Sequence, residues 1–192
     1  MRCLIIKYFL LVLLAFAYVA GTKGQSLSLD LKTSPRLNFD FNTIDKYING
    51  ITVYNVCELN VNVSGMQWDL YVGATTTNAG YWNVNSEYST TGDYPPLSIV
   101  ELRVQNSSKT SLVPGFFQLT DIASPTYIIG TGSAPDVAIN CSNQGTNQPG
   151  DYLASPECYK FRVDMKITPG LNPVYRAGNY ELRIDYVLIE DL

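Results

Sequence analysis

The side chains that most often carry out catalysis are largely missing from this sequence. Its 192 residues contain no histidine, which excludes a Ser–His or Cys–His nucleophile, an imidazole base and a histidine-ligated metal. The sequence also lacks a Cys-x-x-Cys pair and a glycine-rich phosphate loop with its lysine. We therefore predict a protein that is not an enzyme and that holds no cofactor and no metal.

Paired carboxylates are the catalytic arrangement that the composition still permits, because glycoside hydrolysis needs two acids flanking a sugar. The acidic side chains instead occur singly, on faces of alternating stretches that we expect to meet water. Solvated surface charge is the simpler interpretation, and an acid-pair glycosidase is the enzymatic alternative. The acids concerned are Glu58, Asp69, Glu101, Asp164, Glu181 and Asp185.

Several aromatic residues lie in a polar, glycine-containing stretch, residues 73–94, where a ligand could bind without being transformed. Aromatic faces stack on sugar rings, and neighbouring Asn and Asp side chains can hydrogen-bond sugar hydroxyls. The stretch therefore predicts a glycan-contact surface, with loop-anchoring aromatics that pack on their own domain as the alternative. Trp68 alternates with Leu70 and Val72 and is expected in the core. The candidate glycan contacts are Tyr81, Trp82, Tyr88 and Tyr94.

Cysteine usage predicts one disulfide and one free thiol. Cys57, Cys141 and Cys158 follow the N-terminal segment, and three thiols allow at most one internal bridge. The segment between Cys141 and Cys158 is rich in turn formers and has little to pack, so a bridge at its base would stabilise it by ~3 kcal/mol. We predict a Cys141–Cys158 disulfide. Cys57 shares a face with apolar residues and is interpreted as a buried free thiol.

Residues 1–24 have the features of a secretory signal peptide. Arg2 and Lys7 precede an uncharged apolar run, residues 8–20, that is short for a bilayer span. Small residues follow, and we predict cleavage after Gly24, with an uncleaved N-terminal anchor as the alternative. The remaining chain would then be secreted or located at the cell surface, and no other stretch approaches the ~20 apolar residues of a transmembrane helix.

Removing residues 1–24 makes the chain more acidic. The full sequence has 13 basic and 17 acidic residues. The removed segment contains Arg2, Lys7 and Lys23 and no acid, which leaves 10 basic and 17 acidic residues and a net charge of −7. An acidic, exported domain repels phosphate backbones, so nucleic acid is not expected as a partner.

The dominant hydrophobic period along the chain is two, which indicates strands with one buried and one solvated face. The clearest cases are residues 159–167 and 180–188. Only residues 43–48 could form a helical turn. About nine or ten short strands without alternating helices predict an all-β fold, an immunoglobulin-like antiparallel β-sandwich formed by a single domain, residues 25–192. Further strands are expected at 27–31, 37–41, 51–56, 57–63, 67–72 and 98–104, with long polar loops at 73–96 and 140–157.

Two segments resemble a group of bacterial surface proteins. Residues 59–72 contain a strand, a turn and then Trp-x-Leu-x-Val, and residues 176–188 contain Ala-Gly-x-Tyr before a final alternating strand. The pair resembles the pilin-like subunits of chaperone–usher fimbriae, spore-coat-U-like proteins and WxL-type cell-wall domains. The resemblance covers 27 of the 168 residues after residue 24, and it implies an immunoglobulin-like sandwich with a structural, adhesive or envelope-binding role and no catalysis. The sequence Tyr186-Val-Leu188 departs from the WxL pattern, which has a second Trp there.

The stretch 25–31 is a candidate donor strand because its apolar residues occupy alternate positions, as β-strand addition requires. An ordinary first strand of its own domain is the other interpretation. Our main hypothesis is a secreted, non-enzymatic structural subunit of a cell-surface or extracellular fibre or pilus-like assembly, which associates with itself or with related surface subunits. The second hypothesis is a carbohydrate-binding or adhesin module that uses residues 73–94. The candidate donor residues are Leu27, Leu29 and Leu31.

Overall fold

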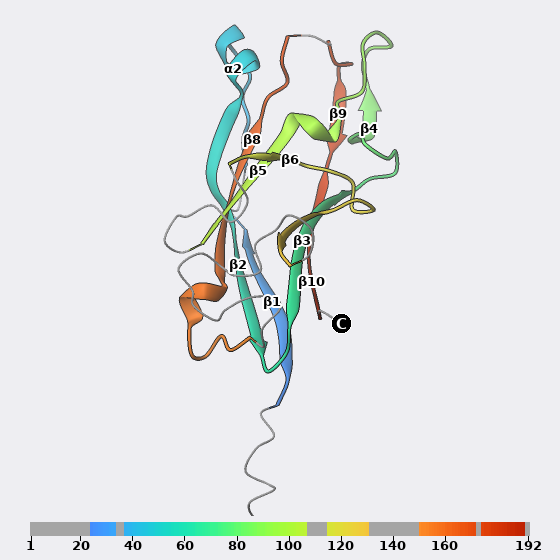
Figure 1. Ribbon diagram of the computed structural model, residues 1–192. Helices are drawn as coiled ribbons and strands as arrows, with labels where there is room; N and C mark the ends of the chain where they lie inside the picture. Colours follow the sequence, from blue (N-terminus) through green and yellow to red (C-terminus); the bar gives the residue numbers. More distant parts are fainter. Residues whose placement is uncertain (1–23, 34–36, 107–114, 131–149, 172–173, 191–192) are drawn as a thin grey trace, which may run out of the picture.

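The computed structural model describes residues 24–33, 37–106, 115–130, 150–171 and 174–190, and within them β-structure dominates (Figure 1). Ten strands pair in antiparallel sheets, and the one α-helix in these ranges has six residues. The prediction of an all-β antiparallel sandwich-like fold with nine or ten strands is therefore confirmed. Cys141 lies outside the described residues. So do residues 1–23 of the expected signal peptide.

The larger sheet has five strands, and its inward face forms half of the core. In spatial order it contains β1 (Ser26–Thr33), β2 (Ile51–Ser64), β8 (Lys160–Ile167), β5 (Val100–Asn106) and β6 (Phe117–Gln118). The alternation in β2 directs Leu59, Val61 and Val63 inward, where all three are buried. In the neighbouring strand β8, Phe161 is paired with Leu59 and is also buried. The period of two thus places one apolar row per strand in the core.

The second layer is a three-stranded sheet with a two-stranded extension. The sheet contains β10 (Arg183–Glu190), β3 (Trp68–Thr75) and β7 (Thr126–Ile129), and the extension contains β4 (Asn83–Glu87) and β9 (Gly178–Glu181). Because β4 follows β3 and β9 precedes β10 along the chain, the extension continues the β3–β10 pair. Trp68 is buried as predicted, and its ring lies 5.7 Å from that of Tyr159, so it joins the two layers.

Two acids that the alternation places on solvated faces are buried instead. Asp164 on β8 is only 2% exposed, because the Arg103 side chain covers it and the rings of Tyr54 and Phe116 lie against that guanidinium. Its carboxylate accepts hydrogen bonds from Arg103 at 2.7 and 3.0 Å and from the Asn55 backbone N–H at 2.9 Å. Asp69 on β3 is buried as well. Period-two reasoning fails here because side chains from neighbouring strands cover the outer face.

The segment before the helix also differs from its prediction. Residues 37–42 alternate like a strand, yet they join no ladder in the structure, and Phe39 and Phe41 pack half-buried against the core edge. The helical turn predicted at 43–48 is present as α2 (Ile44–Asn49). Thr43 caps it, its hydroxyl accepting a hydrogen bond from the Lys46 N–H at 3.3 Å.

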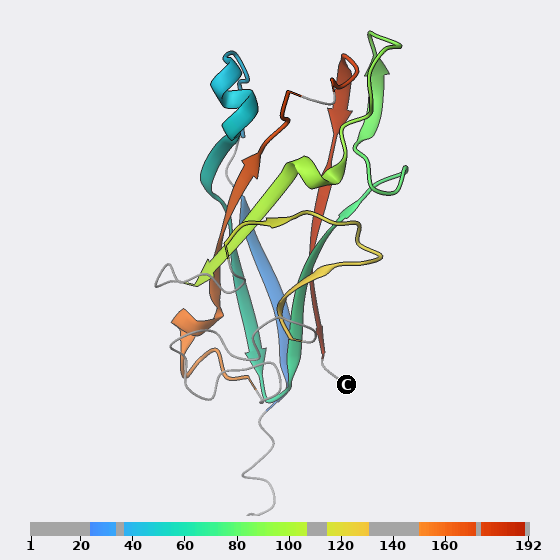
Figure 2. The same cartoon turned by 45° about the horizontal axis from the view of Figure 1, so that its top comes forward.

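The two layers lie close together where β2 turns into β3 and spread apart toward α2 and the β4–β9 pair (Figures 1 and 2). We call these two regions the closed end and the open end. The buried Val63 and Trp68 flank the turn between β2 and β3 at the closed end, and Tyr159 packs against Trp68. At the open end, α2 and β9 stand on opposite sides (Figures 1 and 2). The candidate site lies at the open end.

Candidate functional site

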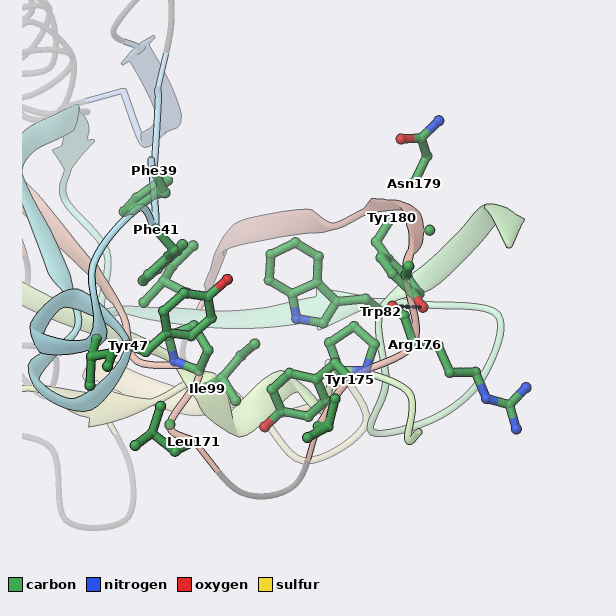
Figure 3. Close-up of a pocket in the computed structure, with 18 of the residues that line it drawn as sticks. Phe39, Phe41, Tyr47, Trp82, Ile99, Leu171, Tyr175, Arg176, Asn179 and Tyr180 are labelled. Carbon is green, nitrogen blue, oxygen red and sulfur yellow. Dashed lines mark hydrogen bonds between the residues drawn. The ribbon is translucent and has the colours of Figure 1, made fainter. Parts of the chain in front are cut away.

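A groove with a volume of about 1200 Å³ lies between the two layers at the open end (Figure 3). One wall comes from α2 and the segment before it, and the other comes from β9 and residues 174–177. Ile99, just before β5, and Ile167, at the end of β8, also line the groove. We call this concavity the aromatic groove because six rings line it: Phe39, Phe41, Tyr47, Trp82, Tyr175 and Tyr180.

The helical wall is held in place by the end of β8. Gly50, which ends α2, has φ +76, and a Cβ there would lie 2.7 Å from the carbonyl oxygen of Ile167. Glycine therefore allows both the left-handed backbone and the close approach. The Tyr47 carbonyl accepts a hydrogen bond from the Gly170 N–H at 2.9 Å, and the rings of Phe41 and Tyr47 lie 5.4 Å apart. This wall is thus a packed surface.

Trp82 projects from the opposite wall toward Phe41 and Tyr47 (Figure 3). Its backbone N–H donates to the Pro95 carbonyl at 3.0 Å, which holds the backbone from which the indole projects. Its indole Nε1 is buried and has no hydrogen-bond partner among the described residues. Tyr180 lies on β9 and donates its hydroxyl to the Arg176 carbonyl at 2.9 Å. The indole N–H is therefore an unused hydrogen-bond donor in the lining.

Arg176 and Asn179 in the lining are already engaged by hydrogen bonds outside the groove. Arg176 donates to the Gly92 carbonyl at 2.9 Å and to the Tyr94 hydroxyl at 3.0 Å, and Asn179 donates to the Tyr88 hydroxyl at 2.6 Å. In Figure 3 the side chains of Arg176 and Asn179 point away from the rings. The guanidinium and the Asn179 amide are thus unavailable to a ligand in the groove, whose lining consists mainly of rings and aliphatic side chains.

Aliphatic side chains form the rim of the aromatic groove and remain in water. Ile44 is 69% exposed, Val174 is 70% exposed and Leu171 is 55% exposed. All three line the groove. Exposed apolar residues are ordinary when scattered, but a group of them around an apolar groove marks an interaction surface.

The structure separates the four predicted glycan contacts. Trp82 lines the aromatic groove. Tyr81 and Tyr94 instead line a second, smaller crevice with a volume of about 280 Å³. Tyr88 lies at neither place, and its hydroxyl is held between Ser86 at 3.2 Å and Asn179 at 2.6 Å. The four residues therefore do not form one platform.

Sequence reasoning missed most of the aromatic groove. Phe39 and Phe41 were interpreted as a strand face, and Tyr47 as part of a helical turn. The sequence places Tyr180 in the Ala-Gly-x-Tyr motif and on the apolar face of the strand predicted at 180–188, and Tyr175 lies two residues before that motif. One signal in the sequence could have indicated these residues. Aromatic residues are frequent in segments flanked by Gly and Pro, where the alternation of apolar and polar residues ends.

The candidate donor segment forms the edge strand β1. It pairs with β2 of its own chain over its whole length, from Ser26 opposite Ser64 to Thr33 opposite Cys57. Leu27 and Leu29 pack half-buried against the core, while Leu31 is 48% exposed. Among the described strands β1 has no partner on its outer side. In the single chain this segment is thus a first strand that has one unpaired edge.

The cysteines lie away from both concavities. Cys57 is free and buried, as interpreted from the sequence, and its thiol contacts the Tyr186 hydroxyl oxygen at 3.6 Å. Burial raises the pKa of the Cys57 thiol, and burial also raises the pKa of Tyr186 well above its ordinary value. Cys158 is disulfide-bonded. Cys141, its predicted partner, lies outside the described residues.

Comparison with known proteins does not place the chain in a family: no family model matches it, and none of the curated proteins does. Among the described residues no helix is both long enough and apolar enough to cross a membrane. The same part of the chain contains no group of three or more Cys, Asp or Glu side chains that could hold a metal ion. The class that fold and site define is therefore a sandwich-like all-β protein with an apolar groove at one end.

Proposed function

We propose that this chain is an exported, non-enzymatic subunit of a cell-surface or extracellular assembly, and that the aromatic groove receives a strand edge of a second copy. The observation that carries the proposal is the apolar groove with its exposed aliphatic rim. Aliphatic side chains gain little from contact with sugar hydroxyls, but they gain from burial against other apolar side chains, about 25 cal/mol per Å². The groove therefore favours a protein partner.

An unpaired strand edge runs beside the groove. Among the described strands β9 pairs only with β4, and β10 pairs only with β3. Both views in Figures 1 and 2 place β4 on the side of β9 that faces away from α2, so the free edge of β9 faces the groove. Unpaired N–H and C=O groups next to apolar pockets are what strand addition uses.

The donor in this proposal is β1 of the next copy. Its outer edge has no partner among the described strands, and Leu31 is exposed near the end of that edge. The donor and acceptor surfaces are different parts of the molecule, which makes the contact heterologous. Heterologous contacts produce rings or open filaments rather than symmetric dimers, and this geometry supports a fibre.

Two surface variants test the proposal on residues 25–192, the chain without its expected signal peptide. Ile44→Asp charges the acceptor rim and Leu31→Asp charges the donor edge, and both sites are exposed enough to tolerate the change. Light scattering and electron microscopy should show concentration-dependent oligomers for the natural chain and monomers for each variant alone. A mixture of the two variants should give 1:1 dimers, because each retains one intact surface.

The matched control is Leu153→Asp, which charges a leucine that is 73% exposed and lies outside both surfaces, and it should assemble normally. Uniform monomers of the natural chain at the highest attainable concentration would rule out self-assembly. Oligomers that persist in both rim and edge variants would rule out these two surfaces as the contact.

A further inference from the structure

The lining of the smaller crevice contains a carboxylate, Asp93, whereas no acidic side chain among the described residues lines the aromatic groove. The crevice lies between residues 92–94 with Pro96, Tyr81 and residues 175–176, and its volume is about 280 Å³. That is close to the lower limit of small-ligand sites, roughly 300 Å³. We call it the Asp93 crevice. Tyr175 and Arg176 border both concavities, whereas Tyr81 and Asp93 belong to the crevice alone.

Backbone pairing makes the Asp93 crevice rigid. Asp93 and Tyr175 form a parallel bridge, in which the Asp93 N–H donates to the Val174 carbonyl at 3.0 Å and the Asp93 carbonyl accepts from the Arg176 N–H at 2.9 Å. A second bridge joins Tyr81 to Pro96. Gly92 has φ +100, and a Cβ there would lie 2.5 Å from the Val174 carbonyl oxygen. The walls are therefore preorganised, which lowers the entropy cost of binding.

Arg176 forms one side of the crevice, and its positive charge already interacts with the Tyr94 ring and the Glu87 carboxylate. The guanidinium lies 4.4 Å from the centre of the Tyr94 ring and 3.6 Å from the Glu87 carboxylate. The Tyr94 hydroxyl donates to Glu87 at 2.5 Å, and this hydrogen bond is the main reason why the pKa of Tyr94 is raised. The network holds the Tyr94 ring and leaves no free positive charge for an anion.

The Asp93 carboxylate, in contrast, is exposed and makes no hydrogen bond or ion pair with another described residue. The Tyr81 and Tyr175 hydroxyls are likewise without hydrogen-bond partners in this part of the chain. Burial, and to a smaller extent the charge of Asp93, raise the pKa of Tyr175, so its phenol stays protonated at neutral pH. The crevice thus offers a free carboxylate acceptor, two phenols and aromatic ring faces.

We propose that the Asp93 crevice binds a neutral sugar residue. A carboxylate can accept hydrogen bonds from two adjacent sugar hydroxyls, and such charge-assisted bonds are about twice as strong as neutral ones. The exposed ring of Tyr81 provides a face for the C–H side of the sugar. Glu87 and Asp93 together outweigh Arg176 by one negative charge, so acidic sugars are repelled. Binding here is independent of the aromatic groove and of assembly.

Saturation-transfer NMR and titration test the proposal on residues 25–192 carrying Leu31→Asp, which keeps the protein monomeric if it assembles. The probes are the methyl glycosides of glucose, galactose and mannose and N-acetylglucosamine, with glucuronic acid and N-acetylneuraminic acid as acidic comparators. At least one neutral sugar should bind, and the acidic ones should not. Asp93→Ala and Tyr81→Ala should each weaken binding by about 10-fold or more, the loss expected for a charge-assisted hydrogen bond or a stacked ring.

Tyr88→Ala is the matched control, since it removes an exposed tyrosine from the same loop region but outside the crevice, and it should bind like the parent. Asp93→Asn keeps the shape and removes the charge, and it should show an intermediate loss. The proposal is overturned if no neutral sugar binds, if acidic sugars bind equally well, or if the folded Asp93→Ala and Tyr81→Ala proteins bind as the parent does. Ile44→Asp should leave sugar binding unchanged, which separates this result from the assembly test.

Discussion

The closed and open ends of the sandwich use the same kind of residue in opposite ways. At the closed end, inward-facing residues such as Val63 and Trp68 are almost completely removed from water. At the open end, Ile44, Leu171 and Val174 surround the aromatic groove and remain largely exposed. The closed end therefore stabilises the fold, and the open end retains apolar surface that can stabilise a contact with another molecule.

The two concavities at the open end differ as clearly. They share Tyr175 and Arg176, yet one is lined by rings and aliphatic side chains and the other has a free carboxylate. The two concavities therefore lie on the two sides of one short segment, residues 174–177. The predictions below test how independent the two ends are.

The largest effect is expected in the core. Phe161→Ala removes a fully buried ring that lies 6.3 Å from the ring of Trp68, and it should lower the free energy of unfolding by about 3–5 kcal/mol through lost burial and a cavity. Urea unfolding followed by tryptophan fluorescence measures this. A loss below about 1 kcal/mol would mean that the core is not the main source of stability.

Alkaline pH should destabilise the fold through Cys57 and Tyr186. Their pKa values are raised from 9.0 and 10.0, so above these values the unfolded chain loses protons that the folded chain retains. Their favourable contribution is complete below pH 9 and then decreases, by up to about 1.4 kcal/mol per pH unit for each group. Urea unfolding between pH 7 and 10.5 should show the decrease, and Tyr186→Phe should reduce its slope. An equal slope in both proteins would contradict this assignment.

Removing the helix cap should have a moderate, local effect. Thr43→Ala deletes the hydroxyl that accepts from the Lys46 N–H, at a cost of about 1 kcal/mol. Hydrogen exchange should accelerate at the Lys46 and Gly50 amides, because the Gly50 N–H donates to the Lys46 carbonyl within the same turn. Equal acceleration throughout β2 and β8 would show that the two ends unfold together.

The smallest effect on stability is expected at the groove rim. Ile44→Asp replaces a side chain that is 69% exposed, and it should change the free energy of unfolding by no more than about 0.5 kcal/mol. The same variant is expected to abolish assembly. A large loss of stability would instead show that Ile44 belongs to the core.

Alternation predicted the strands that have one buried face. Residues 57–63 and 159–167 form the centre of the larger sheet, and Trp68 lies in the core where its pattern placed it. The same reasoning was wrong for Phe39 and Phe41, because a period of two indicates a strand only where a partner strand is present. It was also wrong in placing Asp164 on a solvated face. The residues next to Asp164 in the sequence do not indicate that Arg103, on the neighbouring strand, covers it.

The candidate site was predicted only in fragments. Trp82, a predicted glycan contact, lines the aromatic groove, but the sequence predicted no binding role for Phe41 and Tyr47 on the facing wall or for the Asp93 carboxylate. The residues of each concavity come from segments that are far apart in the sequence, and their neighbourhood depends on how far the two layers spread. The same holds for Leu31. Its alternating pattern predicts an apolar strand face, but its 48% exposure follows from the position of β1 at the edge of the larger sheet.

By itself, the amino-acid sequence determined the alternating strands, the absence of histidine chemistry and the density of aromatic residues near the ends of strands. These are local properties, because the pleat of a strand and the chemistry of a side chain do not depend on distant residues. Only the tertiary structure decided that the layers close at one end and open at the other, that Trp82 and Tyr81 face different concavities, and that β9 has a free edge. Strand order and layer separation arise from long-range packing, which no short segment of the sequence encodes.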